Sequence, residues 1–365
     1  MAHTSGSFEL IVLGCSGGPL SGKTCAFLLK PAHVSFEQIL KEQQSHLIAL
    51  DAGSGLETVA DIVADCRNNT NNVSSYLTGL YPDSEPLHHY SDISSLTTAR
   101  PFNSAVLQLN KSNLELARAI ISKISAYFIT HAHLDHIAGL VINSPGFSGS
   151  TKVHGSEETI DTLKNHIFNG KVWPDLDYIQ YKAFPSTPAF QKVGQAMHLK
   201  AYPTSHGLIH SKFRYKSAAF LIREDTKDDH ILVFGDVESD PSSNTNYIEQ
   251  IWSDVAELVL SKQLRTIVIE CSSVDKAPSE PLFGHMSPLN LIKEFSQLSK
   301  ICSQKNPTTK HPLQGINVLI IHVKETFDGT GDPRKKILNK LRQLNLEHDL
   351  GLHFTMCMPG LSYII

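Results

Sequence analysis

Several kinds of segment are missing from this chain of 365 residues, and each absence argues against a class of protein. No apolar run approaches the ~20 residues that a helix needs to cross a bilayer, so we expect no membrane partner. The N-terminus lacks the basic and then apolar pattern of a secretory signal. The six cysteines form no C-x-x-C pair. We therefore expect free thiols in a reducing compartment, and hence a cytoplasmic protein.

Excess positive charge is also missing. The chain has 32 Lys and Arg against 36 Asp and Glu, which gives a net charge of −4. Proteins that bind nucleic acid usually neutralise phosphates with clustered basic side chains. The longest basic run, Arg334-Lys335-Lys336, has three residues. We therefore expect no nucleic-acid partner, and the hydrophobic content of 41% is that of a globular protein with a sizeable core.

Short apolar runs and amphipathic segments alternate along the chain. The apolar runs predict strands at 8–13, 25–29, 47–50, 126–129, 218–222, 231–234, 266–269 and 318–321. The amphipathic segments predict helices at 57–66, 114–123, 157–166, 248–261, 288–299 and 335–344. This mixture predicts an α/β sandwich, with sheets inside and helices outside. Residues 67–104, rich in Asn, Ser, Thr, Pro and His, are interpreted as an insertion or lid within a single domain at 1–365.

One stretch near the N-terminus matches a phosphate-binding motif. Residues 17–24 fit G-x-x-x-x-G-K-[ST] after a predicted strand, and Asp236 resembles the acidic strand end that holds Mg²⁺ in such proteins. A phosphate-binding loop also needs a helix that begins at its Lys-Thr pair. Here a short apolar run ends at Pro31 instead, so we interpret residues 17–24 as a turn between two strands. A non-catalytic protein that binds ATP with Mg²⁺, without zinc, remains the alternative from a different class.

The most informative segment is Thr130-His-Ala-His-Leu-Asp-His136, directly after the apolar run at 126–129. Neutral imidazole and carboxylate are ligands for a borderline ion such as Zn²⁺. His131 and His133 are two residues apart, so both can face one ion, while Asp135 and His136 can face a second ion. The segment therefore predicts two adjacent metal half-sites.

Further candidate ligands occur at other predicted strand ends. His206 follows a β-like run, Asp236 lies just past the strand at 231–234, and His322 ends the strand at 318–321. Asp51 ends the strand at 47–50 within an Asp-x-Gly turn. Each residue alone could simply cap a turn. Together they give the order His-x-His-x-Asp-His, His, Asp, His.

This order resembles the signature of the metallo-β-lactamase superfamily over nearly the whole chain. The longer string His-Ala-His-Leu-Asp-His-Ile-Ala-Gly-Leu-Val-Ile-Asn-Ser-Pro at 131–145, with the glycine-rich turns at 14–19 and 51–55, is similar to the class II 3′,5′-cyclic-nucleotide phosphodiesterases. The resemblance implies a metallo-β-lactamase-like αββα sandwich, with two mixed β-sheets flanked by helices. It also implies hydrolysis of cyclic AMP, with cyclic GMP left open, to the 5′-monophosphate by a metal-bridged hydroxide. Such an enzyme lowers intracellular cAMP signalling.

The resemblance also implies a role for each candidate residue. The site would hold two Zn²⁺ ions, with other divalent metals left open. One ion would be bound by His131, His133 and His206, and the other by Asp135, His136 and His322. Asp236 would bridge the two ions. Asp51 would orient the ligand loop through hydrogen bonds. A separate similarity, to the tRNA 3′-processing branch of the superfamily, suggests that His285 is the general acid and that Glu270 orients it. Asp135 is the alternative proton donor, and a homodimer is left open.

Two other hydrolase functions share these ligands. An RNA-processing endonuclease is the runner-up, but the basic arm or patch that usually holds the RNA is not found. A thioesterase or lactamase would not be expected to share the Gly-Leu-Val-Ile-Asn-Ser-Pro string at 139–145. Tyr81, Tyr90 and Phe147 are candidates for stacking on a purine, if the insertion folds over the site.

Overall fold

The computed structural model describes residues 6–43, 45–92, 96–147, 149–210, 212–275 and 282–365. Within them the chain forms two mixed β-sheets. The first sheet contains, in spatial order, β4 (Thr97–Ala99), β15 (Ser362–Ile364), β1 (Phe8–Gly14), β2 (Ala26–Pro31), β3 (Leu47–Leu50), β5 (Ile124–Phe128), β6 (Thr151–Gly155) and β7 (Ile179–Ala183). The strands from β3 to β7 are parallel, and the remaining pairs are antiparallel.

The second sheet contains, in spatial order, β14 (His353–Met356), β13 (Asn317–Ile321), β12 (Leu264–Glu270), β11 (His230–Phe234), β10 (Phe213–Glu224), β9 (Met197–Ile209) and β8 (Gln191–Val193). Its strands from β11 to β14 are parallel, and those from β8 to β11 are antiparallel. A continuous apolar core joins the inner faces of the two sheets. In β1, for example, Leu10 and Val12 face this core while Ile11 faces the helices, so both faces of the strand are buried and its sequence is apolar throughout.

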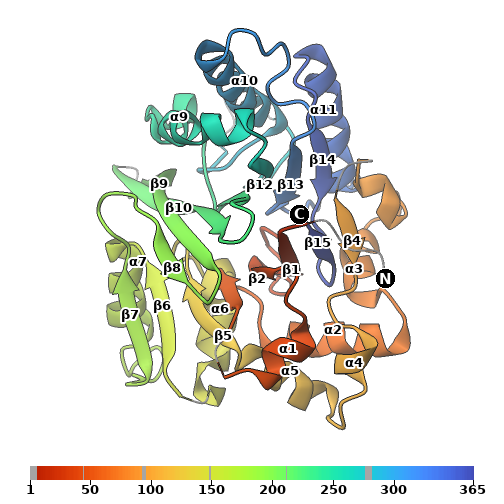
Figure 1. Cartoon of the computed structure of the whole chain (residues 1–365), viewed down its shortest axis with the longest axis vertical. Helices are drawn as coiled ribbons and strands as arrows, with labels where there is room; N and C mark the ends of the chain where they lie inside the picture. The colour runs from red at the N-terminus through yellow and green to blue at the C-terminus, as the bar shows by residue number, and fades with distance from the viewer. Residues whose placement is uncertain (1–5, 44, 93–95, 148, 211, 276–281) are drawn as a thin grey trace.

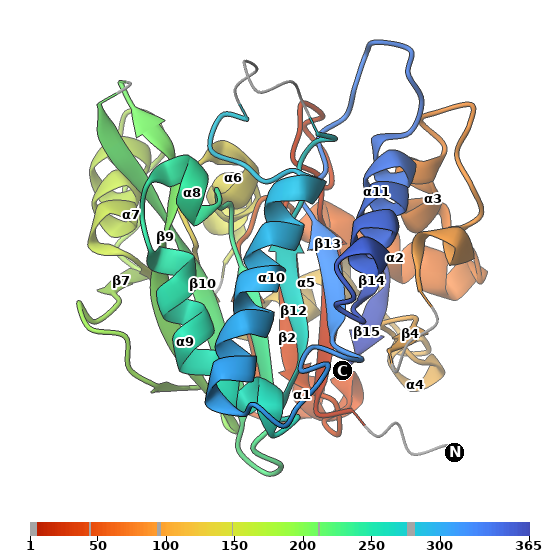
Figure 2. The ribbon, with the colours of Figure 1, turned by 90° about the horizontal axis from the view of Figure 1, so that it is seen from above.

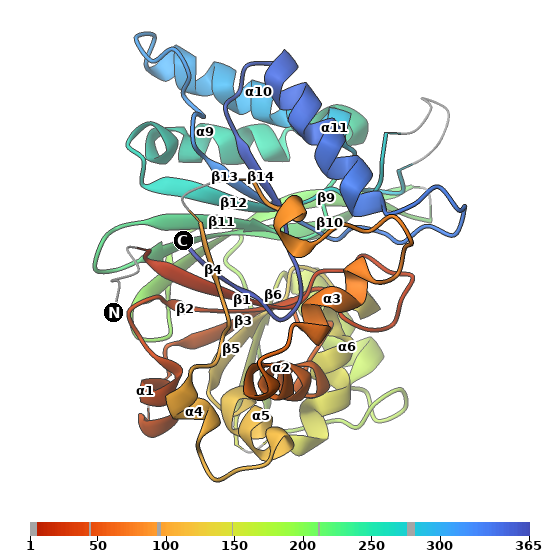
Figure 3. The same ribbon diagram turned by 90° about the vertical axis from the view of Figure 1, so that its right-hand side faces the viewer.

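Helices cover the outer face of each sheet. The first sheet is covered by α1 (Phe36–Lys41), α2 (Leu56–Asn68), α3 (Asn72–Thr78), α4 (Ser104–Leu107), α5 (Asn113–Ile121), α6 (Leu134–Asn143) and α7 (Glu157–Thr162), which continues as η3 (Leu163–Ile167). The second sheet is covered by α9 (Tyr247–Leu260), α10 (Pro288–Lys305) and α11 (Pro333–Glu347), with the short α8 (Asp240–Ser243) before α9. Short 3-10 turns are η1 (Leu87–Tyr90) and η2 (Ser144–Gly146). The four layers are visible edge-on in Figure 3, and Figure 1 shows the same arrangement from the front.

The predicted strands and helices are all confirmed. Most ends agree within a few residues, although β10 is longer than the run at 218–222 and α10 extends six residues beyond the predicted end at 299, to Lys305. The turn interpretation of residues 17–24 is also confirmed, because β1 ends at Gly14, Ser16 bridges to Thr24 and β2 follows at Ala26 without a helix.

The segment 67–104 has its own local structure. It contains α3, η1 and β4, and β4 pairs with β15 at the edge of the first sheet. The hydroxyl group of Tyr81 donates a hydrogen bond to Glu325 at 2.9 Å. This segment is therefore attached to the loop between β13 and α11. In the part of the chain that the structure describes, no helix is both long enough and apolar enough to span a bilayer.

Candidate active site

The predicted ligands gather where several parallel strands end. The loop after β5 contains the histidine motif, Asp236 follows β11, and His322 follows β13. His206 lies near the end of β9. Figure 2 shows the loops after β1 and β13 and the β9–β10 hairpin projecting to one side of the sandwich, and Figure 3 agrees. The topology thus brings residues that are far apart in the sequence to one edge.

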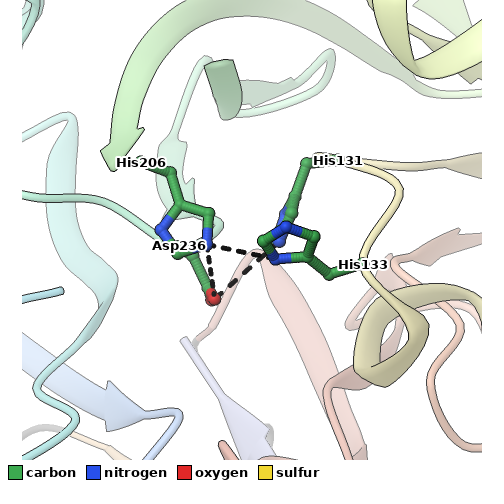
Figure 4. Close-up of side chains that lie close together, drawn as sticks. All are labelled: His131, His133, His206 and Asp236. Atoms are coloured by element: carbon green, nitrogen blue, oxygen red, sulfur yellow. Dashed lines mark hydrogen bonds and ion pairs between the residues drawn. The ribbon is translucent and has the colours of Figure 1, made fainter. Parts of the chain in front are cut away.

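The first group of side chains consists of His131, His133, His206 and Asp236 (Figure 4). One potential ligand atom from each residue lies within 4.8 Å of the others. Nε2 of His206 is 3.2 Å from Nδ1 of His133 and 3.6 Å from Oδ2 of Asp236. Nε2 of His131 is 3.8 Å from the same oxygen. Three imidazole nitrogens and one carboxylate oxygen therefore converge on a single point.

The second group consists of Asp135, His136, His322 and the same Asp236. Nε2 of His322 is 3.1 Å from both Oδ2 of Asp135 and Oδ2 of Asp236. Nε2 of His136 is 3.2 Å from Oδ1 of Asp236. Asp236 therefore lies between the two groups and faces both of them.

Asp51 contacts the loop that contains the histidine motif. Its carboxylate accepts hydrogen bonds from the backbone N–H of Thr130 at 2.8 Å, from the Thr130 hydroxyl group, and from Nδ1 of His136 at 2.8 Å. Because the single proton of the Thr130 hydroxyl points to Asp51, its oxygen accepts from Nδ1 of His131, 3.0 Å away. In both histidines Nδ1 is therefore directed away from the cluster and Nε2 faces it.

Two further histidines are oriented in the same way from the other sheet. Nδ1 of His206 donates to the carbonyl oxygen of Gly284 at 2.8 Å. The hydroxyl group of Ser272 donates to Glu270, so its oxygen accepts from Nδ1 of His322 at 3.0 Å. Such outer contacts fix the tautomer and the ring orientation of metal-binding histidines.

These residues fit a metal ion. Nε2 of His131, Nε2 of His136 and Oδ1 of Asp236 are buried and have no hydrogen-bond partner within the described residues. Burial lowers the pKa of His131 well below its usual value, which keeps it neutral. Asp236 is 2% exposed, and burial alone would raise its pKa. The neighbouring His322 and His136 lower this pKa well below its usual value, so the carboxylate is ionised although it is buried. Imidazole nitrogens and carboxylate oxygens gathered this closely are the donor set that a divalent cation such as Zn²⁺ takes. The cluster is therefore compatible with a metal site.

Glu270 and His285 also lie in contact. Nδ1 of His285 lies 2.9 Å from Oε1 of Glu270, and both side chains are buried. Burial opposes a charged imidazole, but the charge and hydrogen bond of Glu270 raise the pKa of His285 above its usual value. The His285 ring lies 4.8 Å from the ring of His206 and 5.0 Å from that of His322, between centroids. The pair is therefore next to both ligand groups.

Two residues near the cluster were not predicted. The ring of Tyr215 stacks on His133 with centroids 4.7 Å apart, and its hydroxyl group accepts from the backbone N–H of Ala132 at 3.3 Å. Cys25 lies within 4.8 Å of ligand atoms of His136 and His322. Neither residue belongs to a motif, because each is placed there only by strand pairing.

The purine-stacking prediction is wrong for Tyr90. This residue is 2% exposed, packs in the core of the second sheet and donates its hydroxyl proton to Asp332 at 2.5 Å. Phe147 stacks on Tyr127, with ring centroids 5.9 Å apart, in the layer of helices over the first sheet. Both rings are therefore engaged in packing.

Two mixed sheets with helices outside and a buried His/Asp cluster at the loop edge define a metallo-β-lactamase-like fold, so the predicted architecture is confirmed. Residues 48–360 match the family described as class-II cAMP phosphodiesterases. The chain is 33% identical to a 3′,5′-cyclic-nucleotide phosphodiesterase of Candida albicans, over 98% of this chain and 100% of that protein. It is 31% identical to 3′,5′-cyclic-nucleotide phosphodiesterase 1 of Saccharomyces cerevisiae, over 97% of this chain and 98% of that protein.

A solved structure agrees with these sequence matches. The crystal structure of unliganded yeast PDE1 superposes with a TM-score of 0.86 at 30% identity, covering 99% of this chain and all of that one. The chain therefore belongs to the class-II cAMP phosphodiesterase family. The predicted enzyme class, a 3′,5′-cyclic-nucleotide phosphodiesterase, is confirmed.

Proposed function

We propose that this chain hydrolyses 3′,5′-cyclic AMP to 5′-AMP at a centre of two zinc ions, and so lowers cAMP signalling. The observation that supports this most directly is the position of Asp236 between two groups of ligand atoms. One ion would be held by His131, His133 and His206, the other by Asp135, His136 and His322, with Asp236 as the bridge. The name of the matched family supports cyclic AMP as the substrate.

Two divalent ions bound there would supply Lewis acidity toward phosphoryl oxygens and a source of hydroxide at neutral pH. The chain itself supplies orientation. Asp51 fixes His136 directly and His131 through the Thr130 hydroxyl group. Ser272 fixes His322 in the same manner. These three ligand nitrogens are thus held in place before any ion or substrate arrives, which lowers the cost of reorganisation.

The reaction also needs a proton donor. When the P–O3′ bond breaks, O3′ leaves as an alkoxide, which must gain a proton. We assign that proton to His285. Nδ1 of His285 donates a hydrogen bond to Glu270, and Glu270 raises the pKa of His285. Nε2 is then the ring nitrogen that remains for the substrate. Asp135 is the alternative donor, but the hydrogen bond from His322 and the charge of His136 hold the pKa of Asp135 below its usual value, against the effect of burial.

The test is incubation of the purified, zinc-loaded protein with cyclic AMP, with the product identified by phosphorus NMR. Appearance of 5′-AMP that stops after chelation of the metal is expected. Asp236→Asn should lose zinc and activity together, because it removes the charge shared by both ligand groups. If cyclic AMP is not hydrolysed while zinc stays bound, cyclic AMP is excluded as the substrate, and RNA or a thioester becomes the substrate to test.

Other aspects of the function stay predictions. All six cysteines are free thiols, and five of them are buried, which supports a reducing compartment such as the cytoplasm. The lid role of residues 67–104 within a single domain, and the homodimer, are likewise proposals. Light scattering of the purified protein tests the oligomeric state.

A further inference from the structure

A cavity of about 650 Å³ lies at the open end of the sandwich where β8 faces β5, β6 and β7. Its lining includes Phe128, Lys152, His154, Lys182 and Lys192. None of its lining residues belongs to the His/Asp cluster. This cavity is therefore distinct from the active site, although it lies against β5, the strand that leads into the histidine motif.

The charge of this cavity is one-sided. Among the residues that the structure describes, three lysines and one histidine line it and no acidic residue does, in a chain whose net charge is −4. The strand register pairs His154 with Lys182 and Lys152 with Gln180, so Lys152, His154 and Lys182 share one face of the sheet. Across the described residues, neither Lys152 nor Lys182 has a hydrogen-bond or ion-pair partner. Like charges placed side by side without a counter-charge are unfavourable.

His154 adds a buried hydrogen-bonding group to the same face. Its side chain is 8% exposed, its ring stacks on Phe128 at 4.7 Å between centroids, and its Nδ1 is buried without a partner in the described structure. Burial, and then the charges of Lys182 and Lys152, lower the pKa of His154 to about 4. The imidazole is therefore neutral at pH 7 and keeps one N–H to donate.

We propose that this cavity binds a small anion that bears a phosphate group, with Lys152 and Lys182 pairing its charge and His154 donating a hydrogen bond. Two ammonium groups match the charge of a phosphate dianion, and charge-assisted hydrogen bonds are the strong ones. Lysines on an edge strand such as β7 also discourage pairing with other chains. That role, however, does not require a buried histidine without a partner beside them. The site does not depend on the proposed function.

Histidine NMR of the zinc-loaded protein tests this site, because His154 is a reporter within it. The His154 ring signal is assigned by comparison with His154→Asn. Inorganic phosphate, AMP and adenosine are then titrated at constant ionic strength, with chloride as the balancing ion. We expect a saturable shift with phosphate and with AMP but not with adenosine. We also expect the pKa of His154 to rise when phosphate is bound, since the anion offsets the lysine charges.

The matched variants are the double substitutions Lys152→Ala with Lys182→Ala, and Lys164→Ala with Lys171→Ala. Both remove two exposed lysines, but only the first pair lines the cavity. The first is expected to weaken the phosphate-dependent shift at least tenfold, and the second to leave it unchanged. Tighter binding of AMP than of phosphate would identify a nucleotide, and equal binding would identify the phosphate group alone. Absence of a saturable shift, or an equal loss in both double variants, would overturn the proposal.

Discussion

Replacement of Asp51 by Asn tests how the proposed metal ligands are positioned. The Asp51 carboxylate is 4% exposed and accepts from the backbone and hydroxyl groups of Thr130 and from Nδ1 of His136. Its backbone has a φ of 52°, a left-handed conformation that Asn adopts as readily as Asp. The substitution therefore preserves the shape and the backbone, and changes only the charge and the number of acceptor oxygens.

The size of the effect follows from the hydrogen-bond inventory. Asn has one acceptor oxygen and one donor group, so it cannot accept from both Thr130 and His136. If its oxygen stays on Thr130, its N–H₂ group faces Nδ1 of His136, whose proton must move to Nε2. That nitrogen lies 3.2 Å from Asp236, within the ligand cluster. A charge-assisted hydrogen bond contributes about 1.5–3 kcal/mol. Since each 1.4 kcal/mol is a factor of ten, zinc affinity at this group should fall about 10- to 100-fold.

Competition with a chelating dye measures the affinity for each of the two proposed zinc ions. Weaker binding is expected mainly for the ion held by His136, because an amide oxygen that stays on Thr130 keeps His131 in place, and His206 and His133 make no contact with Asp51. Thr130→Ser is the matched control, since it keeps every hydrogen bond of the hydroxyl group, and it should bind both ions normally. If Asp51→Asn binds both ions within twofold of the original protein, the reasoning about tautomers is refuted.

Three other changes follow from single contacts. Gly17→Ala places a methyl group 2.5 Å from Nδ1 of His322 and should lower zinc content and activity at least tenfold, whereas Gly22→Ala, with open space around it, should change neither in a metal assay. His285→Gln is expected to keep both ions but lose at least 100-fold in kcat, and unchanged turnover would exclude it as the proton donor. Burial raises the pKa of Glu294 to about 7, so its contribution to stability is present below about pH 4.5 and lost as pH rises to 7. In urea unfolding, Glu294→Gln should therefore have a higher free energy of unfolding than the original protein at pH 8, by up to about 3 kcal/mol, and no gain at pH 4. Equal gains at pH 8 and pH 4 would contradict this.

The metal-ligand candidates could be predicted because the strands before them have a simple pattern. β11 and β13 are buried on both faces, so their apolar runs are unbroken and the polar residue that ends each run is conspicuous. Asp236 and His322 were found in this way. The histidine motif is compact in the sequence, so its spacing alone indicates metal chemistry. Glu270 and His285 were found only by similarity, since their 15-residue separation has no periodic meaning.

Contacts between distant segments could not be predicted in the same way. The contact of Asp51 with the ligand loop was implied only by the family resemblance, since Thr130 and Asp51 are 79 residues apart and their pairing depends on the parallel register of β3 and β5. Tyr215 reaches His133 only because β10 is far longer than its apolar run indicates. Helix α6 was missed because its first turn lies within the metal motif, where polar ligands interrupt the apolar periodicity. In each case the competing influence is tertiary packing.

The two sheets contribute complementary parts of the cluster. The loop after β5 in the first sheet presents the histidine motif, while the second sheet presents His206, Asp236 and His322. Neither set alone surrounds Asp236 with ligands, so the site exists only when the inner faces of both sheets are packed together. An ion that binds there stabilises the packed state by RT ln(1 + [M]/Kd), about 4 kcal/mol at a thousandfold excess over Kd. The same ion offsets the cost of burying Asp236 as a carboxylate. Packing of the sandwich and occupation of the site are therefore coupled equilibria, and each favours the other.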